Sequence, residues 1–219
     1  MDGWGIGYFK KDRARVEKSA EGAYVAGRVH DSFQRLARVV KSRIILCHVR
    51  LRTSGPVDEC NAHPFVLSFI GHDWLFVHNG KAPAVESYHT SSAPVEDAHS
   101  DSARAFEYLR DQLCSRLQKS PAALPALFEA LCQSTAALIN EYPGNYNYLL
   151  TNGLVVFAFT NHRQFMLLKG SRKLEGGLML TTLERGLSDE NWVRVAKSTS
   201  RQGLLLMISG ADIIFQQAI

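Results

Sequence analysis

Residues 45–64 read ILCHVRLRTSGPVDECNAHP, a stretch in which an apolar run passes directly into a polar loop. The run over residues 44–49 is rich in β-branched residues and predicts a buried strand. Arg50 and Arg52 follow at its end, and because side chains alternate along a strand, both guanidinium groups point to the same side. A guanidinium presents a planar fork of donors, so this strand end suits a small carboxylate ligand. A salt bridge at the protein's rim is the alternative.

The composition is that of an ordinary globular protein. The 219 residues are 46% hydrophobic and 21% charged, with a formal net charge of +4, so one domain over residues 1–219 can bury a large core. The charge is too small to predict nucleic acid binding, and the densest basic stretch, residues 10–15 (KKDRAR), is predicted to lie in a solvated loop. We find no apolar run of about 18 residues and no secretory signal. The sequence predicts a cytoplasmic protein that binds neither nucleic acid nor membrane.

The cysteines and histidines follow no pattern that is typical of a metal site. The 4 cysteines, at positions 47, 60, 114 and 132, lack the spacing of a zinc site or a disulfide framework. His48, His63 and His78 recur at 15-residue intervals, which match no compact ligand motif. The sequence therefore predicts no metal and no cofactor.

Strand and helix patterns occur in blocks rather than in βαβ alternation. Strands are predicted over residues 4–9, 44–49, 65–70, 73–78, 146–150, 154–160, 165–168, 178–182, 192–196, 204–209 and 213–215, and helices over 32–40, 102–119 and 120–142. Gly5 and Gly7 alternate with large residues, where another backbone could approach closely. Residues 82–99 are polar and are predicted to form a long loop that could act as a lid. The order favours antiparallel sheets with helices packed outside.

Two further groups, taken with Arg50, suit an amino-acid ligand. Asn79-Gly80, at a strand end, can present a side-chain amide and a backbone N–H together, as an oxyanion hole requires, although such a pair alone is more often only a turn. Asp101 precedes a helix and is most simply an N-cap, but an aspartate in a pocket can pair with an ammonium group. A guanidinium for a carboxylate, an acid for an ammonium and an amide corner for a carbonyl oxygen together describe a site for glutamine.

The ordered motifs of the first half of the chain resemble those of the class II glutamine amidotransferases, which are N-terminal nucleophile (Ntn) hydrolases. They are Asp2-Gly3-Trp4-Gly5, His48-Val49-Arg50 with Thr53 and Gly55, Asn61-Ala62-His63-Pro64, His78-Asn79-Gly80 and Ser100-Asp101-Ser102. The first and the last are closest to the stand-alone branch that acts on glutamine or γ-glutamyl compounds. The resemblance implies an α+β fold, a four-layer αββα sandwich of antiparallel sheets.

The same resemblance assigns roles to the matching positions. They are Arg50 and Thr53 for the α-carboxylate of glutamine, Asp101 for its α-amino group, Asn79 and Gly80 for the oxyanion hole, and His63 and Pro64 for the shape of the loop beneath the substrate. The implied reaction is hydrolysis of the γ-amide of glutamine or of a γ-glutamyl compound through a thioester. Because no synthase domain is attached, the ammonia either is released or passes to a separate synthase partner, and a homo-oligomer is possible.

The nucleophile is where the sequence departs from the family. In the family it is a cysteine at the first position of the mature chain, with its own α-amino group as the base, whereas this sequence begins Met1-Asp2. We therefore expect an N-terminally truncated domain that is inactive as given, and an in-frame Met-Cys upstream of Met1 would supply the thiol. Cys60, near His63 in sequence, is the internal substitute to consider, but it lacks an α-amino base.

Two readings without catalysis stay open. The chain could be a silent module that binds glutamine-like ligands through Arg50, Asn79-Gly80 and Asp101 and regulates a partner. It could also be a fragment that fails to fold, because loss of a central strand exposes an unpaired edge.

Overall fold

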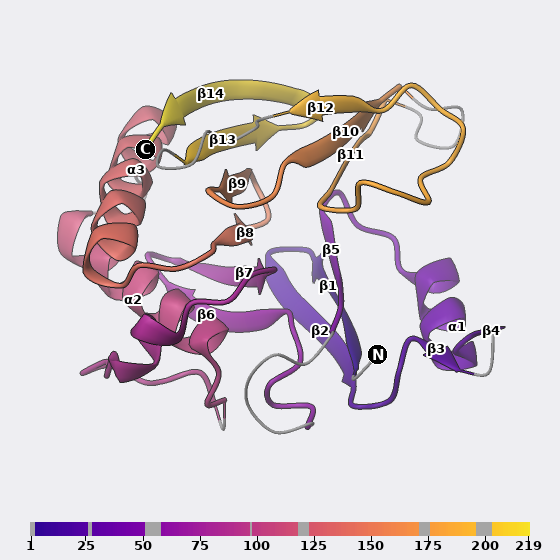
Figure 1. The fold of residues 1–219 in the computed structure, drawn as a ribbon, viewed down its shortest axis with the longest axis horizontal. Helices are drawn as coiled ribbons and strands as arrows, with labels where there is room; N and C mark the ends of the chain where they lie inside the picture. The colour runs from indigo at the N-terminus through magenta and orange to yellow at the C-terminus, as the bar shows by residue number, and fades with distance from the viewer. Residues whose placement is uncertain are drawn as a thin grey trace.

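Six antiparallel strands form the largest sheet of the protein (Figure 1). From one edge to the other they are β14 (Asp212–Ala218), β13 (Leu204–Ser209), β9 (Val156–Thr160), β8 (Asn147–Thr151), β7 (His72–His78) and β6 (Phe65–Phe69). The computed structural model that contains this sheet describes residues 3–25, 28–50, 58–96, 98–117, 123–170, 176–195 and 203–219. The sheet joins strands from the first half of the chain to strands from its last third.

Two three-stranded sheets and a short hairpin hold the other strands. The first sheet has the order β2 (Arg13–Ser19), β1 (Trp4–Lys10), β5 (Ile45–Val49), and the second has the order β11 (Leu178–Thr181), β10 (Phe165–Lys169), β12 (Val193–Val195). The hairpin pairs β3 (Tyr24–Val25) with β4 (Arg28–Val29). Every pairing between the described strands is antiparallel, which confirms the predicted α+β class with antiparallel sheets.

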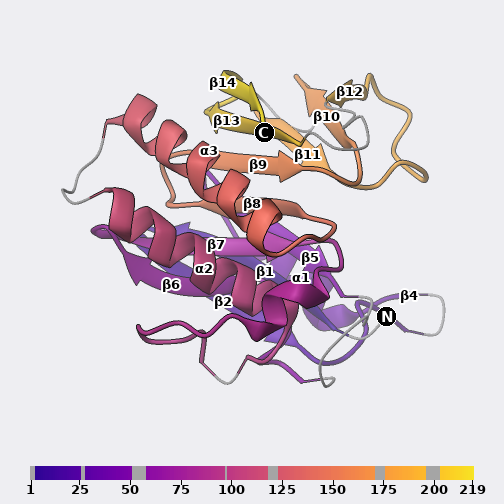
Figure 2. The same ribbon diagram turned by 60° about the vertical axis from the view of Figure 1, so that its left-hand side comes forward.

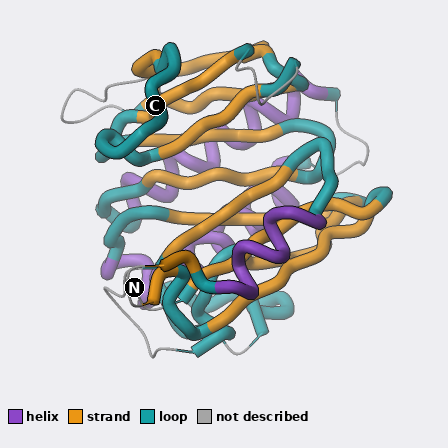
Figure 3. The backbone as a smooth tube through the Cα atoms, turned by 90° about the vertical axis from the view of Figure 1, so that its right-hand side faces the viewer, coloured by secondary structure: helices purple, strands orange, loops and turns teal. Residues whose placement is uncertain are grey.

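The helices lie on the outer sides of these sheets. They are α1 (Asp31–Val39), α2 (Asp101–Arg116) and α3 (Leu124–Glu141), with a short 3-10 helix, η1 (Pro83–Ser87). Figure 2 shows α2 and α3 side by side across one face of the six-stranded sheet. In Figure 3 the strands lie between α1, in front, and the other helices behind them. In the described part of the chain no helix has both the length and the apolar character needed to cross a bilayer.

The alternation of side chains along β7 explains why the six-stranded sheet is covered on both faces. Trp74 and Phe76 belong to the core under the helices, where the ring centroid of Phe76 lies 4.9 Å from that of Phe106 on α2. Leu75 and Val77 point the other way and pack with residues of β1 and β5. Successive residues of a strand face opposite sides, so one apolar run fills two cores.

The glycines of β1 permit the close approach that their spacing predicts. A Cβ added to Gly5 would lie 2.0 Å from the carbonyl oxygen of His63, and one added to Gly7 would lie 2.9 Å from Cγ of Pro64. The His63–Pro64 peptide bond is cis. Because no side chain other than hydrogen fits between these backbones, β1 holds the 61–64 loop directly against its surface.

The prediction of a solvated loop over residues 10–15 is wrong for most of that stretch. Only a tight turn separates β1 from β2, which begins at Arg13 and pairs along its whole length with β1. Ala14 and Val16 pack inward, while the alternate residues Arg13, Arg15 and Glu17 are exposed. The period-2 alternation was present in the sequence, but the density of charges on the exposed face concealed it.

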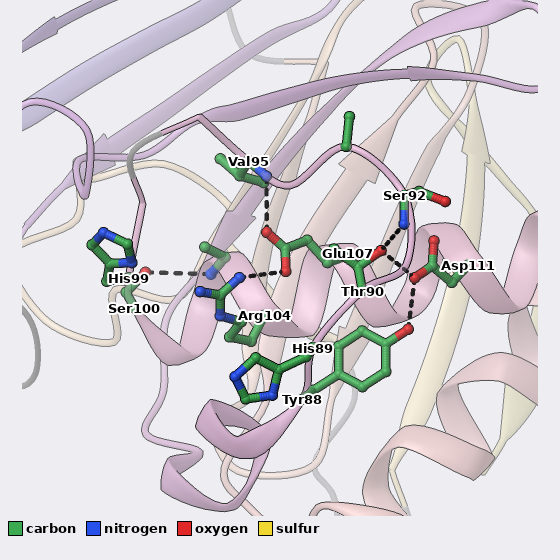
Figure 4. A network of polar contacts seen from close by, with 12 residues as sticks. Tyr88, His89, Thr90, Ser92, Val95, His99, Ser100, Arg104, Glu107 and Asp111 are labelled. Atoms are coloured by element: carbon green, nitrogen blue, oxygen red, sulfur yellow. Dashed lines mark hydrogen bonds and ion pairs between the residues drawn. The ribbon is translucent and has the colours of Figure 1, made fainter.

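Apart from η1, the described part of residues 82–99 is irregular, as predicted, and polar side chains of α2 hold it (Figure 4). Glu107, which is 0% exposed, accepts a hydrogen bond from the backbone N–H of Val95 at 2.8 Å and pairs with Arg104 at 2.8 Å. Asp111 accepts hydrogen bonds from the hydroxyls of Tyr88 and Thr90 at 2.6 and 2.7 Å. These contacts fix the segment along the helix.

Replacing Glu107 by alanine is expected to lower the free energy of unfolding by about 3 kcal/mol, because it leaves the Arg104 guanidinium and the Val95 N–H without their partner. Urea unfolding measures the loss, and limited proteolysis within residues 88–96 should become faster. The matched control is Glu86→Ala, at an exposed position of η1. Equal stability of the two variants would contradict the anchoring role.

Candidate functional site

A cavity of about 320 Å³ is lined by the ends of β5 and β7 and by the start of α2. Its lining residues come from six separate stretches of the chain: 48–50, Asn61 and His63, 78–81, 100–102, Asn145, and 162–163. Of the residues assigned by sequence, the cavity brings together Arg50, His63, Asn79, Gly80 and Asp101. Pro64 lies outside it and borders a different hollow, and Thr53 lies outside the described residues. None of the described residues of 82–99 lines it, so the lid prediction finds no support.

Asp101 connects the start of α2 to the segment that follows β7. The N-cap of α2 is Ser100, whose Oγ accepts from the backbone N–H of Ala103 at 3.3 Å. Asp101 is 4% exposed, and its Oδ2 accepts from the backbone N–H of Ala82 at 2.8 Å while Oδ1 accepts from that of Ser102 at 2.8 Å. The carboxylate therefore lines the cavity and fixes the corner formed by residues 79–82 at the same time.

The Asn79-Gly80 corner is held from below by β8 and by the residues just before that strand. The backbone N–H of Asn79 donates to the carbonyl of Asn147 at 2.7 Å, and Lys81 forms an isolated antiparallel bridge with Asn145. A Cβ on Gly80 would lie 1.9 Å from the carbonyl oxygen of Asn145, so only glycine fits here. The corner is a closely packed feature rather than a free turn.

The side-chain amide of Asn79, which the sequence predicted for an oxyanion hole, makes a hydrogen bond that the sequence did not predict. Its amide nitrogen donates to Oγ1 of Thr182 at 3.3 Å, just after β11. Thr182 is 103 positions away in sequence, so no local pattern pointed to it. The contact ties the corner to the second three-stranded sheet.

Three histidines form a group beside these residues, with His63 and His78 buried and His48 half-buried. The rings of His48 and His63 lie 4.2 Å apart between centroids, and Nδ1 of His63 accepts from the backbone N–H of His78 at 3.4 Å. Nε2 of His78 lies 3.1 Å from the carbonyl of Asn145, which can only accept, so Nε2 carries the proton. Nδ1 of His78 lies 2.8 Å from the hydroxyl oxygen of Ser102, which also lies 3.2 Å from Oδ1 of Asp101, so these two acceptors share one hydroxyl proton.

Burial keeps these histidines neutral. Loss of water, followed by the nearby His78 ring and the Arg50 guanidinium, lowers the pKa of His48 to about 4. Burial likewise lowers the pKa of His63 and of His78. The described residues contain no group of three histidine, cysteine, aspartate or glutamate side chains placed to hold a metal ion. The group therefore contributes shape and hydrogen bonds, not positive charge.

Acid is expected to destabilise the protein because of these histidines. The ordinary pKa of 6.5 is higher than the folded pKa of about 4 for His48, so the unfolded chain takes up the proton first as pH falls. The stabilisation is complete above pH 6.5 and is lost as pH falls towards 4, with a slope of up to about 1.4 kcal/mol per pH unit for each such histidine. Urea unfolding between pH 7 and 4.5 measures it. His48→Gln should reduce the slope and the exposed His89→Gln should not; equal slopes would contradict this account.

None of the 4 cysteines lines the cavity. Cys47 is exposed on β5, with its side chain on the opposite face from His48, as strand alternation predicts. Cys60 is partly buried and borders a different hollow, and Cys114 and Cys132 lie on α2 and α3. The internal substitution by Cys60 that the sequence raised is therefore not supported.

Sequence reasoning missed the cavity residues that come from the second half of the chain. His162 and Arg163 follow β9, and the side chain of Asn147 holds their turn: its Nδ2 donates to the carbonyl of Arg163 at 2.8 Å and its Oδ1 accepts from the N–H of Arg163 at 3.0 Å. The only local signal was a polar turn, Asn161-His162-Arg163, between two strands. Long-range strand pairing alone brings this turn to the site.

Comparison with known proteins gives a consistent result. The sequence profile of the class-II glutamine amidotransferases matches residues 1–173. Over 162 residues the chain is 29% identical to YafJ of Escherichia coli K12, a candidate glutamine amidotransferase (72% of this chain, 60% of the relative). It is also 29% identical over 162 residues to a protein of the same description from Haemophilus influenzae (73% and 53%). The chain thus spans little more than half the length of these relatives.

The fold has a counterpart among solved structures. A predicted glutamine amidotransferase from Pseudomonas aeruginosa PA01 superimposes with a TM-score of 0.72 at 19% identity, over 98% of this chain and 87% of that one. At this identity the likeness concerns the fold alone. The fold is Ntn-hydrolase-like, as in the class-II amidotransferase domains.

Proposed function

Because the chain belongs to the class-II glutamine amidotransferase family, we propose that its cavity binds glutamine or a γ-glutamyl compound for hydrolysis of the γ-amide. Residues 1–219 would form one amidotransferase domain, an αββα sandwich, in a cytoplasmic protein. The observation that carries the proposal is the convergence of Arg50, Asp101 and the Asn79-Gly80 corner on one cavity of about 320 Å³. Arg50 follows β5, Asn79-Gly80 follow β7, and Asp101 begins α2. If each residue only stabilised its own element, the three would not need to line the same cavity.

The charged side chains of the cavity are suited to bind the α-carboxylate and the α-ammonium group of an amino acid. Arg50 is 6% exposed and its guanidinium would hold the α-carboxylate by two parallel hydrogen bonds. The buried carboxylate of Asp101 would accept from the α-ammonium group. Both groups are already fixed by the fold, so little side-chain entropy is lost when the ligand binds.

The reaction in this proposal needs a thiol and an oxyanion site. Sulfur attacks the amide carbon, the carbonyl oxygen becomes an oxyanion, and the C–N bond breaks as ammonia leaves with the thiol proton. Water then attacks the thioester and releases glutamate. The N–H of Gly80 and the amide of Asn79 would stabilise both oxyanions, with the Asn79 amide leaving Thr182 or sharing its donors. His63 and the cis bond to Pro64 would shape the floor.

The proposed thiol is not one of the cysteines of this sequence, because none of them lines the cavity. The proposal therefore takes the nucleophile from outside residues 1–219. The same observation favours a second candidate function, a module that binds a glutamine-like ligand without turnover and regulates a partner. The acceptor of the ammonia, if any, would be a separate synthase.

One experiment separates the two candidates. Glutamine is titrated into the protein by calorimetry, and glutamate release is followed in the same preparation and in the protein purified from its own source. Binding with glutamate release supports the hydrolase, and binding without release from either preparation supports the silent module. If neither glutamine nor a γ-glutamyl compound binds, both candidates are overturned.

A further inference from the structure

We propose that Lys81 and Arg163 select substrates in which the leaving amine carries a carboxylate, that is, γ-glutamyl amino acids or peptides rather than glutamine itself. The inference rests on the proposed function and specifies its substrate. It starts from the charge of the cavity. Among the residues that the structure describes, the lining contains three with permanently cationic side chains, Arg50, Lys81 and Arg163, and one acidic residue, Asp101.

The charge balance decides between the two substrate types. The α-carboxylate and the α-ammonium group of glutamine neutralise one cation and one anion of the lining, which accounts for Arg50 and Asp101. Lys81 and Arg163 are then left facing a neutral side-chain amide. A γ-glutamyl amino acid adds a carboxylate beyond the scissile bond, and this carboxylate gives the two remaining cations an opposite charge.

The placement of the two cations agrees with this assignment. Lys81 directly follows the Asn79-Gly80 corner, where the scissile carbonyl would bind, and its backbone bridges to Asn145. The backbone of Arg163 is held by the side chain of Asn147, two residues after Asn145. Lys81 and Arg163 lie on connections of the six-stranded sheet. Arg50 follows β5, which belongs to the three-stranded sheet β2-β1-β5. The glutamyl carboxylate and the extra carboxylate therefore have cations from different sheets.

A purely solvated role for the two cations is the alternative. Some surface cations of this protein have acidic partners, such as Arg13 with Asp73 and Lys169 with Asp212. Others, such as Lys10 and Arg15, make no ion pair within the described residues, so the lack of a partner does not by itself indicate a ligand site. Lys81 and Arg163 differ from these in lining the cavity. Neither Lys81 nor Arg163 makes an ion pair or a side-chain hydrogen bond within the part of the chain that the structure describes. Both side chains are exposed at a cavity, where an anionic ligand reaches them without breaking an existing contact.

The test compares two ligands of similar size by calorimetry, γ-glutamylglycine with its carboxylate and γ-glutamylethylamide without it. We expect the parent protein to bind the first about tenfold more tightly, with the ratio falling as salt rises. In the double variant Lys81→Met/Arg163→Gln the ratio should fall to about one. The control variant Lys10→Met/Arg15→Gln removes the same charge from exposed positions of β1 and β2 outside the cavity and should keep the tenfold ratio.

The outcomes separate this inference from the function on which it rests. If glutamine and both γ-glutamyl ligands fail to bind the parent protein, the proposed function falls and the inference falls with it. If all three bind with equal affinity, only the inference is overturned. A tenfold ratio that persists in the Lys81→Met/Arg163→Gln variant, or that disappears equally in the control, would overturn the assignment to these two residues.

Discussion

Arg50→Ala is expected to weaken glutamine binding by about thirtyfold to several thousandfold. The variant removes the two-point partner of the α-carboxylate from a position that is 6% exposed, where water replaces it poorly. Truncating one member of such a desolvated charge pair costs roughly 2–5 kcal/mol. Calorimetric titration with glutamine measures the loss, and Arg50→Lys should recover only part of it because an ammonium group lacks the planar fork.

Arg43→Ala provides the matched control for this experiment. Arg43 is exposed just before β5 and does not line the cavity, so its removal changes the net charge equally without touching the site. Its glutamine affinity should equal that of the parent protein. If Arg50→Ala binds glutamine as tightly as the control does, the assignment of the carboxylate to Arg50 is wrong.

Gly80→Ala is expected to lower the free energy of unfolding by about 3 kcal/mol and to abolish ligand binding. The new Cβ would lie 1.9 Å from the carbonyl oxygen of Asn145 and 2.6 Å from Nε2 of His78, so the Lys81–Asn145 bridge has to open. Overpacking of a rigid backbone contact reaches the upper part of the 1–3 kcal/mol range. Urea unfolding measures the free energy of unfolding, and calorimetric titration with glutamine measures the ligand affinity.

Gly170→Ala separates this steric clash from ordinary backbone strain. Gly170 has a φ of +70° but no atom within 4 Å of an added Cβ, so alanine there costs only the left-handed conformation, about 1 kcal/mol. Ligand binding should be unaffected. Equal losses of stability in the two variants would mean that the corner at Gly80 is less closely packed than the structure indicates.

Much of the fold was readable from local sequence patterns. The apolar runs and turn pairs placed both strands of the β6–β7 hairpin and the strands from β8 to β14, and the glycine alternation in β1 correctly indicated a close backbone contact. An error occurred where a strand is charged on one face, as in β2. The sequence also did not indicate that polar residues of α2 hold the irregular segment before it, as Glu107 holds Val95. The partner strand of β2 is its sequence neighbour β1, so charge and not distance concealed it, whereas Glu107 lies 12 positions from Val95.

The candidate site divides in the same way. Motif order pointed to Arg50, Asn79-Gly80 and Asp101, because each stands at the end of an element whose pattern is local. Lys81 had no motif to mark it, and Arg163 and Thr182 come from stretches without one. Their contribution depends on the pairing of β8 with β7, which no local pattern specifies.

By itself the sequence determined the types of the elements and the chemical groups at their ends, because periodicity and turn chemistry act over a few neighbouring residues. Only the tertiary structure decided which of those groups share a cavity, how many cations surround it, and that none of the cysteines reaches it. The physical reason is that antiparallel pairing and the packing of two sheets bring together residues more than a hundred positions apart, through contacts that no short stretch encodes.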